Sequence, residues 1–208
     1  MKNLRELLNS FTKDDYPNRI NLHIHTKFSD GEGNAEKILA SAKNKGYKLI
    51  AITDHNTVEA HKNLSDDILL TGVEFDCWFG YVFIHLLAYG IDINHASIQP
   101  FLAKNKQDTS DVLPRLFAKR NVKELINAIH EAGGIAVLAH PACYWTLSLE
   151  SLVRDLVKIG LDGIEVYYPY PRFRGIVKFH SANKVLKIAE KYSQLIKTGG
   201  TDFHGQDF

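Results

Sequence analysis

The sequence predicts one α/β domain whose strands close into a barrel, and three observations lead to this fold class. Short apolar runs rich in Ile, Val and Leu recur without strict alternation, which is typical of buried parallel strands. Helical stretches with one apolar face lie between several of these runs, and strand then helix in repetition is the α/β pattern. No Gly-x-Gly-x-x-Gly follows the first run, which disfavours an open dinucleotide-binding sheet. About seven strands with intervening helices therefore favour a barrel.

The expected elements follow in chain order. Residues 1–19 are polar and predict a lead-in with one helix, and residues 20–208 form the domain. The expected strands are residues 20–25, 48–53, 68–75, 81–91, 134–140, 162–168 and 194–200. The expected helices are residues 34–45, ending at Gly46, residues 121–132, a helix capped by Ser148 and stopped by Gly160, and residues 181–193. Residues 92–120 are polar, contain Pro100 and Pro114, and predict a lid-like loop excursion.

Composition excludes several classes of protein. The 208 residues carry a net charge of +1, which gives no support to non-specific nucleic-acid binding. The N-terminus has no apolar segment typical of a signal peptide, and no apolar run approaches the roughly 20 residues of a membrane helix. Two cysteines do not make a disulfide framework. We therefore expect a cytoplasmic protein with no membrane partner; the sequence leaves the oligomeric state open.

Histidines and carboxylates gather where the apolar runs end. Residues i and i+2 of a strand point to the same side, so His23 and His25 project together. In a parallel barrel the C-terminal strand ends open on one face, where the active site lies. The other polar residues at or near run ends would meet there too. The full candidate set is His23, His25, Asp30, His55, Glu74, His85, His140, Asp202 and His204.

These residue types indicate a metal centre. Nine candidates exceed what one zinc-like ion binds, so we expect two or three divalent ions with a carboxylate such as Glu74 bridging a pair. Mixed imidazole and carboxylate ligands suit zinc, manganese or iron. Clustered ions lower the pKa of bound water and stabilise a transition state with spread negative charge, as in phosphoryl transfer.

The ordered motifs resemble those of the PHP (polymerase and histidinol phosphatase) family. They are "HIHTKFSDG" 23–31, "ITDHNT" 52–57, "GVEF" 72–75, "IHLLAYGID" 84–92, "GGIAVLAHPA" 133–142, "GIEVYYP" 163–169 and "GGTDFHG" 199–205. The resemblance implies a distorted seven-stranded (β/α)7 TIM-like barrel with its metal site at the C-terminal strand ends. It also implies a metal-dependent phosphoesterase that attacks phosphorus with a metal-bridging hydroxide.

The resemblance also implies how the ligands are shared. His23, His25, Glu74 and Asp202 look like ligands of one ion; Glu74, His85 and His140 of a second; Asp30, His55 and His204 of a third. Asp30, His55, Asp202 and His204 are the implied catalytic residues. The group that protonates the leaving oxygen stays open.

The substrate is expected to be a small phosphorylated molecule, because the chain resembles the family's single-domain members acting on such compounds, nucleotides included. Two departures bear on this expectation. Those members carry a helical insert with basic residues between the "HLLAYGID" and "AHP" motifs, and here that connection is short. They often carry an arginine where this chain has Cys143. Candidate phosphate-binding residues are Arg172, Arg174 and Lys27, with Arg115, Lys119 and Arg120 as replacements for the insert.

For several other residues the sequence allows either a functional or a structural role. Asp54 either orients a neighbouring ligand or caps its loop. Cys143 is interpreted as a small buried thiol rather than a ligand, and Tyr167, Tyr168 and Tyr170 as packing at the barrel rim rather than contacts to a base. The four histidines away from strand ends are interpreted as surface or structural: His61, His95, His130 and His180.

Three other functions are weighed against the phosphoesterase. A nuclease for short nucleic acid would use the same centre but needs a basic track, which the near-neutral charge does not support. An amidohydrolase-like enzyme shares a His-x-His barrel but usually adds a lysine ligand on a central strand, and no lysine lies within the central runs 68–75, 81–91, 134–140 and 162–168. A non-catalytic metal-binding module is disfavoured because all nine ligand positions are intact.

Overall fold

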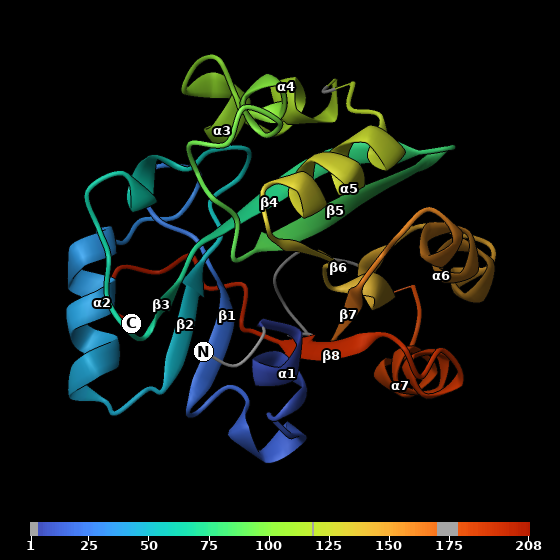
Figure 1. The fold of residues 1–208 in the computed structure, drawn as a ribbon, viewed down its shortest axis with the longest axis horizontal. Helices are drawn as coiled ribbons and strands as arrows, with labels where there is room; N and C mark the ends of the chain where they lie inside the picture. The colour runs from blue at the N-terminus through green and yellow to red at the C-terminus, as the bar shows by residue number, and fades with distance from the viewer. Residues whose placement is uncertain (1–3, 118, 170–178) are drawn as a thin grey trace.

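The computed structural model describes residues 4–117, 119–169 and 179–208, and these residues form a mixed α/β fold with two sheets (Figure 1). The first sheet contains β1 (Ile20–Ile24), β2 (Leu49–Ile52) and β3 (Leu69–Leu70), all parallel. The second contains, in spatial order, β4 (Gly72–Phe79), β5 (Val82–Tyr89), β6 (Ile135–Leu138), β7 (Gly163–Tyr167) and β8 (Ile196–Gly199). The α/β class predicted from the sequence is thereby confirmed.

Four expected helices form, each with a side-chain cap at its N-terminus. They are α2 (Ala35–Asn44), α5 (Val122–Glu131), α6 (Leu149–Lys158) and α7 (Ala182–Lys191), capped by Asn34, Asn121, Ser148 and Ser181. Helix α2 packs on β2, α5 on β4 and β6, and α7 on β7 (Figure 1). The lead-in contains α1 (Leu4–Asn9), whose Leu8 is fully buried in the same apolar cluster as β1 and β8.

The expectation that every run forms a parallel strand is wrong for β4 and β5. These two strands pair antiparallel, and β5 is also antiparallel to β6. The physical reason is the short connection, because Phe79 and Val82 are paired residues and Gly80 adopts a φ of +61° between them. Only an antiparallel pair can be joined by so tight a turn, and glycine enters the left-handed region without steric cost.

The expected strand 68–75 is also two strands. Leu69 and Leu70 pair with β2, whereas the chain from Gly72 onward pairs with β5. At Gly72 a Cβ atom would lie 2.8 Å from Thr53 Cγ2 and 2.9 Å from the carbonyl oxygen of Ile52. The chain therefore crosses β2 too closely for a side chain, and this crossing transfers it from one sheet to the other.

Short bridges join the two sheets at both sides. Ile24 pairs with Phe203 beyond β8, and His55 beyond β2 pairs with Glu74 in β4. Gly200 permits the first junction, because a Cβ atom there would lie 2.4 Å from His23 Cβ. These bridges bring the ends of β1, β2 and β8 to one edge of the fold, although no closed barrel is assigned among the described residues.

The polar segment 92–120 is not a plain loop. It contains a short 3-10 turn at Gln99–Phe101, then α3 (Gln107–Ser110) and α4 (Val112–Leu116), which lie together at one end of the molecule (Figure 1). Lys106 Nζ donates to the carbonyl oxygens of Lys27 at 2.6 Å and Ser29 at 2.8 Å. The segment is therefore fastened to the loop that carries Asp30. In the part of the chain that the structure describes, no helix is long and apolar enough to cross a membrane.

Candidate metal centre

All nine candidate residues from the sequence lie together at one edge of the fold. His23 and His25 come from the end of β1, His55 follows β2, His140 follows β6, and Asp202 and His204 follow β8. Glu74 and His85 lie within β4 and β5 instead of at strand ends. Because β5 runs opposite to its neighbours, the N-terminal half of β5 faces this edge. The nine residues fall into groups whose ligand atoms lie within 4.8 Å of one another.

The first group is His23, His25, Glu74 and Asp202, and all four side chains are buried. His25 Nε2 lies 3.1 Å from Glu74 Oε2 and 3.1 Å from Asp202 Oδ1, and His23 Nε2 lies 3.2 Å from the same Glu74 oxygen. Neither Nε2 atom has a hydrogen-bond partner. Buried polar atoms are rarely left in this way, and these two point at carboxylate oxygens around a shared centre. A divalent cation fits this donor set.

The second group is Glu74, His85 and His140. Glu74 Oε1 lies 2.9 Å from His85 Nδ1 and 3.1 Å from His140 Nε2. The two oxygens of Glu74 therefore face different groups, Oε2 the first and Oε1 the second. This is the arrangement that a carboxylate needs to bridge two ions.

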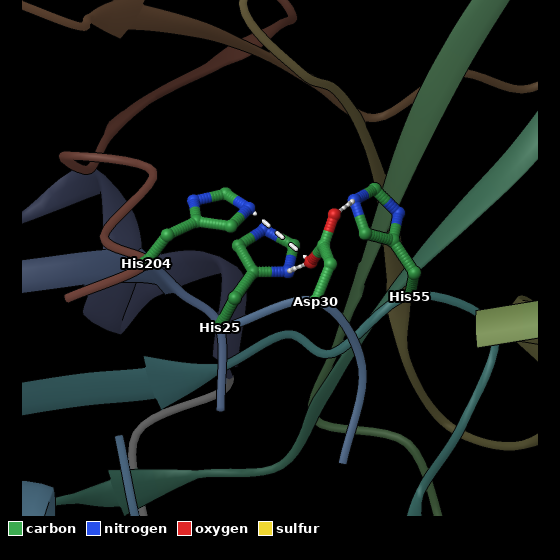
Figure 2. A group of neighbouring side chains, drawn as sticks. All are labelled: His25, Asp30, His55 and His204. Carbon is green, nitrogen blue, oxygen red and sulfur yellow. Dashed lines mark ion pairs between the residues drawn. The ribbon is translucent and has the colours of Figure 1, made fainter. Parts of the chain in front are cut away.

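The third group joins Asp30, His55 and His204 with His25 (Figure 2). Asp30 lies between the rings: Oδ1 is 3.2 Å from His204 Nε2 and 3.5 Å from His25 Nδ1, and Oδ2 is 3.6 Å from His55 Nε2. His204 Nδ1 lies 2.8 Å from the carbonyl oxygen of Asp202, and this bond requires the proton on Nδ1. The Nε2 lone pair of His204 is consequently directed at the group.

Asp76 is a member of the centre that sequence reasoning missed. Its carboxylate is fully buried, and Oδ1 lies 3.2 Å from both His55 Nδ1 and His85 Nε2. The signal was present in "GVEFD", because Asp76 stands two residues after Glu74 and projects from β4 on the same side. Asp76 links a histidine of the third group to one of the second.

Glu165 is the second missed residue. It lies in β7, is fully buried, and Oε1 is 3.1 Å from His23 Nδ1, while the backbone N–H of His140 donates to Oε2 at 2.7 Å. A carboxylate on Nδ1 fixes the tautomer of His23 and leaves Nε2 for a metal. An isolated glutamate inside the apolar run "GIEVYY" was the available signal.

Arg115 is the one basic candidate whose charged group reaches the centre among the described residues. Its guanidinium donates from Nη1 to Asp30 Oδ2 at 2.7 Å and from Nε to Asp76 Oδ2 at 3.0 Å. Arg120 instead donates to the carbonyl oxygens of Asp76 and Phe101, which is a structural role. Lys27 and Lys119 are exposed, and neither lines the cleft described below. Arg172 and Arg174 lie outside the described residues.

The structure decides among several of the alternative interpretations. Asp54 accepts hydrogen bonds from Thr26 N at 2.7 Å and Ser29 Oγ at 2.6 Å, so it closes the loop that carries Asp30. Tyr168 donates to Asp202 Oδ2 at 2.9 Å and thus holds a candidate ligand. The ring of Tyr167 stacks on Tyr16 with centroids 5.4 Å apart, which is packing. Tyr170 lies outside the described residues.

The remaining thiol and histidines take no ligand position in the described groups. Cys143 is half-buried and lines the cleft, but it joins none of the ligand groups. His61 is buried and its Nε2 lies 2.9 Å from the carbonyl oxygen of Ile52, a structural contact. His95, His130 and His180 contact Ser97, Asp162 and Thr146 away from the centre.

Mutual pairing shifts the pKa values of these buried groups. Burial opposes the charged form of His25, but Asp202 and Glu74 outweigh it and raise the pKa of His25 to about 9. Burial likewise opposes the charged form of His140, and its contacts with Cys143 and Glu74 raise its pKa to about 10. Burial alone would raise the pKa values of Glu74 and Asp202, but the surrounding histidines hold them well below their usual range. The carboxylates are thus ionised at neutral pH, as metal binding requires.

The groups line a cleft of about 420 Å³. Phe83, Val112, Leu116 and Tyr144 form apolar walls, and the candidate ligands and Arg115 form the polar floor. A cleft of this size accommodates a small ligand.

Comparisons with known proteins identify the family and similar folds. A family model described as the PHP domain matches residues 21–199. An uncharacterized protein of Methanocaldococcus jannaschii is 29% identical over 189 residues, covering 81% of this chain and 92% of that protein. Phosphoribosyl 1,2-cyclic phosphate 1,2-diphosphodiesterase of Eggerthella lenta is 23% identical over 258 residues, covering 89% and 94%. Among solved structures, an amidohydrolase from Chromobacterium violaceum with bound sulfate and no metal matches with a TM-score of 0.73 and 20% identity, covering 90% of this chain and 88% of its own.

Proposed function

This chain belongs to the PHP domain family, and we propose that it is a metal-dependent phosphoesterase whose substrate is a small phosphorylated molecule. The observation that carries the proposal is the position of Glu74, whose two oxygens face two separate groups of histidine and carboxylate ligands. Paired metal sites joined by one carboxylate are suited to phosphoryl transfer, because both the attacking and the leaving oxygen need stabilisation.

The proposed ligand sets follow the three groups. His23, His25, Glu74 and Asp202 would hold one ion, Glu74, His85 and His140 a second, and Asp30, His55 and His204 a third. The imidazole and carboxylate donors suit zinc, manganese or iron. Bound ions would activate water for attack on phosphorus and offset the negative charge that develops on the phosphoryl group.

The chain's own residues do the remaining work. We propose that Glu165 holds His23 in the tautomer that frees Nε2, and that Tyr168 orients Asp202 by donating to Oδ2. Asp30, His55, Asp202 and His204 are the proposed catalytic residues, because they lie on the polar floor of the cleft. Arg115 is the proposed phosphate ligand once its guanidinium turns away from Asp30 and His55, since a guanidinium binds phosphate through two parallel hydrogen bonds.

A small substrate is favoured over long nucleic acid by two observations. The cleft of about 420 Å³ has apolar walls, and Arg115 is the one basic side chain among the described residues that line it, histidines aside. The net charge of +1 adds no general attraction for a polyanion. The curated relative from Eggerthella lenta acts on a cyclic phosphodiester, and its similarity along most of both chains favours a diester as the second candidate substrate.

We also propose that the two sheets are the halves of one distorted seven-stranded barrel. With the two-residue β3 set aside, the bridges Ile24–Phe203 and His55–Glu74 arrange the other strands in a ring. The amidohydrolase from Chromobacterium violaceum shares the fold. A lysine ligand would favour amidohydrolase chemistry, and no lysine is among the described residues that line the cleft here.

The test is turnover after reconstitution. Metal-stripped protein is loaded with manganese, zinc or iron, and hydrolysis of p-nitrophenyl phosphate and bis-p-nitrophenyl phosphate is measured while bound metal is counted in the same samples. We expect metal-dependent hydrolysis with two or three ions per chain, and the preferred ester separates monoesterase from diesterase. Metal binding without hydrolysis of either ester, or of a cyclic phosphodiester, would contradict the proposal.

A further inference from the structure

The guanidinium of Arg115 lies inside the third ligand group. Nη2 is 2.6 Å from His55 Nε2 and Nη1 is 2.7 Å from Asp30 Oδ2. These are the two atoms of His55 and Asp30 that face each other across the group, 3.6 Å apart. Arg115 is 7% exposed, so its charge is held within the protein and not in solvent.

This position excludes a metal ion bound to the same atoms. A divalent ion would need the lone pair of His55 Nε2 and an oxygen of Asp30 at about 2.0–2.2 Å. The guanidinium donates its protons to those same lone pairs, and it would also repel a second cation at such short range in a buried site. Asp30 and His55 can therefore bind either the arginine or an ion.

The first two groups are not obstructed in this way. The hydrogen bonds and ion pairs of Arg115 within the described chain reach Asp30, His55 and Asp76, and none reaches His23 or Asp202. Arg115 therefore blocks metal binding at the third group and leaves the ligand atoms of the first and second groups free to bind ions.

Arg115 has a second anchor, which allows it to leave Asp30 and His55 without becoming unpaired. Nε and Nη2 donate to the two oxygens of Asp76 at 3.0 and 3.1 Å. Asp76 is itself held by Asn56, which donates to its Oδ2 at 2.5 Å and accepts from its backbone N–H at 3.0 Å. A rotation about the bond from Nε to Asp76 would release Nη1 from Asp30 and Nη2 from His55, while the charge of Arg115 stays beside that of Asp76.

The helix that carries Arg115 has an exposed apolar face. Val112 is 65% exposed and Leu113 is 69% exposed, so α4 buries little apolar surface besides Leu116. An element with few buried contacts opens at low free-energy cost. Arg115 can therefore move away from Asp30 and His55, because its bond to Asp76 keeps the charge paired and the exposed helix can shift with it.

We propose that Arg115 competes with the third divalent ion for Asp30 and His55, so that the first two sites fill readily and the third fills only when Arg115 is displaced. This inference rests on the proposed metal centre and not on the identity of the substrate. It assigns to Arg115 the role of an internal cation that sets the number of ions bound.

The experiment counts zinc bound per chain against free zinc fixed by a chelator buffer, without substrate. Arg115→Met removes the cation and keeps side-chain length, Arg115→Lys keeps a charge without the planar fork, and Lys119→Met removes one exposed charge nearby as the control. We expect wild type and Lys119→Met to bind two ions tightly and a third weakly. Arg115→Met should bind the third ion roughly 10-fold or more tightly than wild type. In wild type the guanidinium occupies the third site most of the time and lowers the apparent affinity for the ion, and methionine removes this competition. Identical third-ion binding in Arg115→Met and wild type would overturn the proposal.

A second measurement uses the wild-type protein in case Arg115→Met does not fold. The arginine Nε–H signal of Arg115, assigned by its absence in Arg115→Lys, is followed by nuclear magnetic resonance during zinc addition. We expect it to shift with the third equivalent and not with the first two; a signal unchanged by the third equivalent would refute the competition. Turnover of p-nitrophenyl esters is measured separately. Inactive protein with the expected zinc isotherms would refute the phosphoesterase proposal alone.

Discussion

Replacing Glu165 with glutamine should weaken the metal centre without removing any ligand. The carboxylate accepts from His23 Nδ1 at 3.1 Å and from the His140 backbone N–H at 2.7 Å, and it is fully buried. A glutamine offers one carbonyl oxygen, so its amide N–H₂ must face one of these two donors. We expect the metal-free protein to lose about 2–3 kcal/mol in free energy of unfolding, from one charge-assisted bond and one unsatisfied donor. Metal affinity should fall about 10–100-fold, since His23 is no longer fixed in one tautomer.

The assay for Glu165→Gln combines urea denaturation of the metal-free protein with zinc affinity measured by chelator competition. Glu131→Gln is the matched control, because Glu131 is an exposed residue of α5 and the same charge is removed. Control and wild type should agree. If Glu165→Gln bound zinc with wild-type affinity, the claim that this carboxylate orients His23 would be wrong.

Three further outcomes are expected. Asp202→Ala should abolish hydrolysis and lower bound metal while circular dichroism shows an intact fold; unchanged turnover would refute the ligand assignment. Tyr144→Phe should lower the free energy of unfolding by about 1–3 kcal/mol in urea denaturation, because Tyr144 Oη accepts from the His85 N–H at 3.0 Å and the partner is left buried. The pKa of His25 is raised to about 9 and that of His140 to about 10. Their stabilisation of the metal-free protein is therefore fully present below about pH 6.5 and is lost as pH rises through those values. Thermal denaturation of metal-free protein from pH 6 to 10 should show falling stability, whereas a flat profile would contradict these directions.

Sequence reasoning located the ligands because strand geometry is local. The two-residue repeat places His23 and His25 on one side, and apolar runs mark where strands end. The same repeat applied to Glu74 would have found Asp76, but a strand end was used as the criterion and Asp76 lies inside β4. Glu165 escaped for the same reason, since an interior strand position was taken as core and its partner on β1 is remote in sequence.

Other features depend on contacts that a single sequence does not encode locally. Helix caps such as Ser148 are local, and the predicted helices formed. Strand direction is not local, and the tight turn at Gly80 was the only sign that β4 and β5 are antiparallel. The position of Arg115 follows from how α4 docks over the Asp30 loop, which the polar character of residues 92–120 does not reveal. Arg115 was therefore one of three equivalent basic candidates until the fold distinguished it from Lys119 and Arg120.

The bridge between Ile24 and Phe203 has a consequence for the order of folding. Glu74 and His85, two members of the second group, lie on the two strands of one hairpin, and this local contact closes quickly; His25 meets Asp202 only after the two ends of the domain come together. Closing so long a loop costs more chain entropy and is slower. The second group can therefore take shape on a partly folded chain, while the first and third are completed at the last step. An ion bound by the first group therefore shows that folding of the chain has finished, whereas an ion bound by the second group does not.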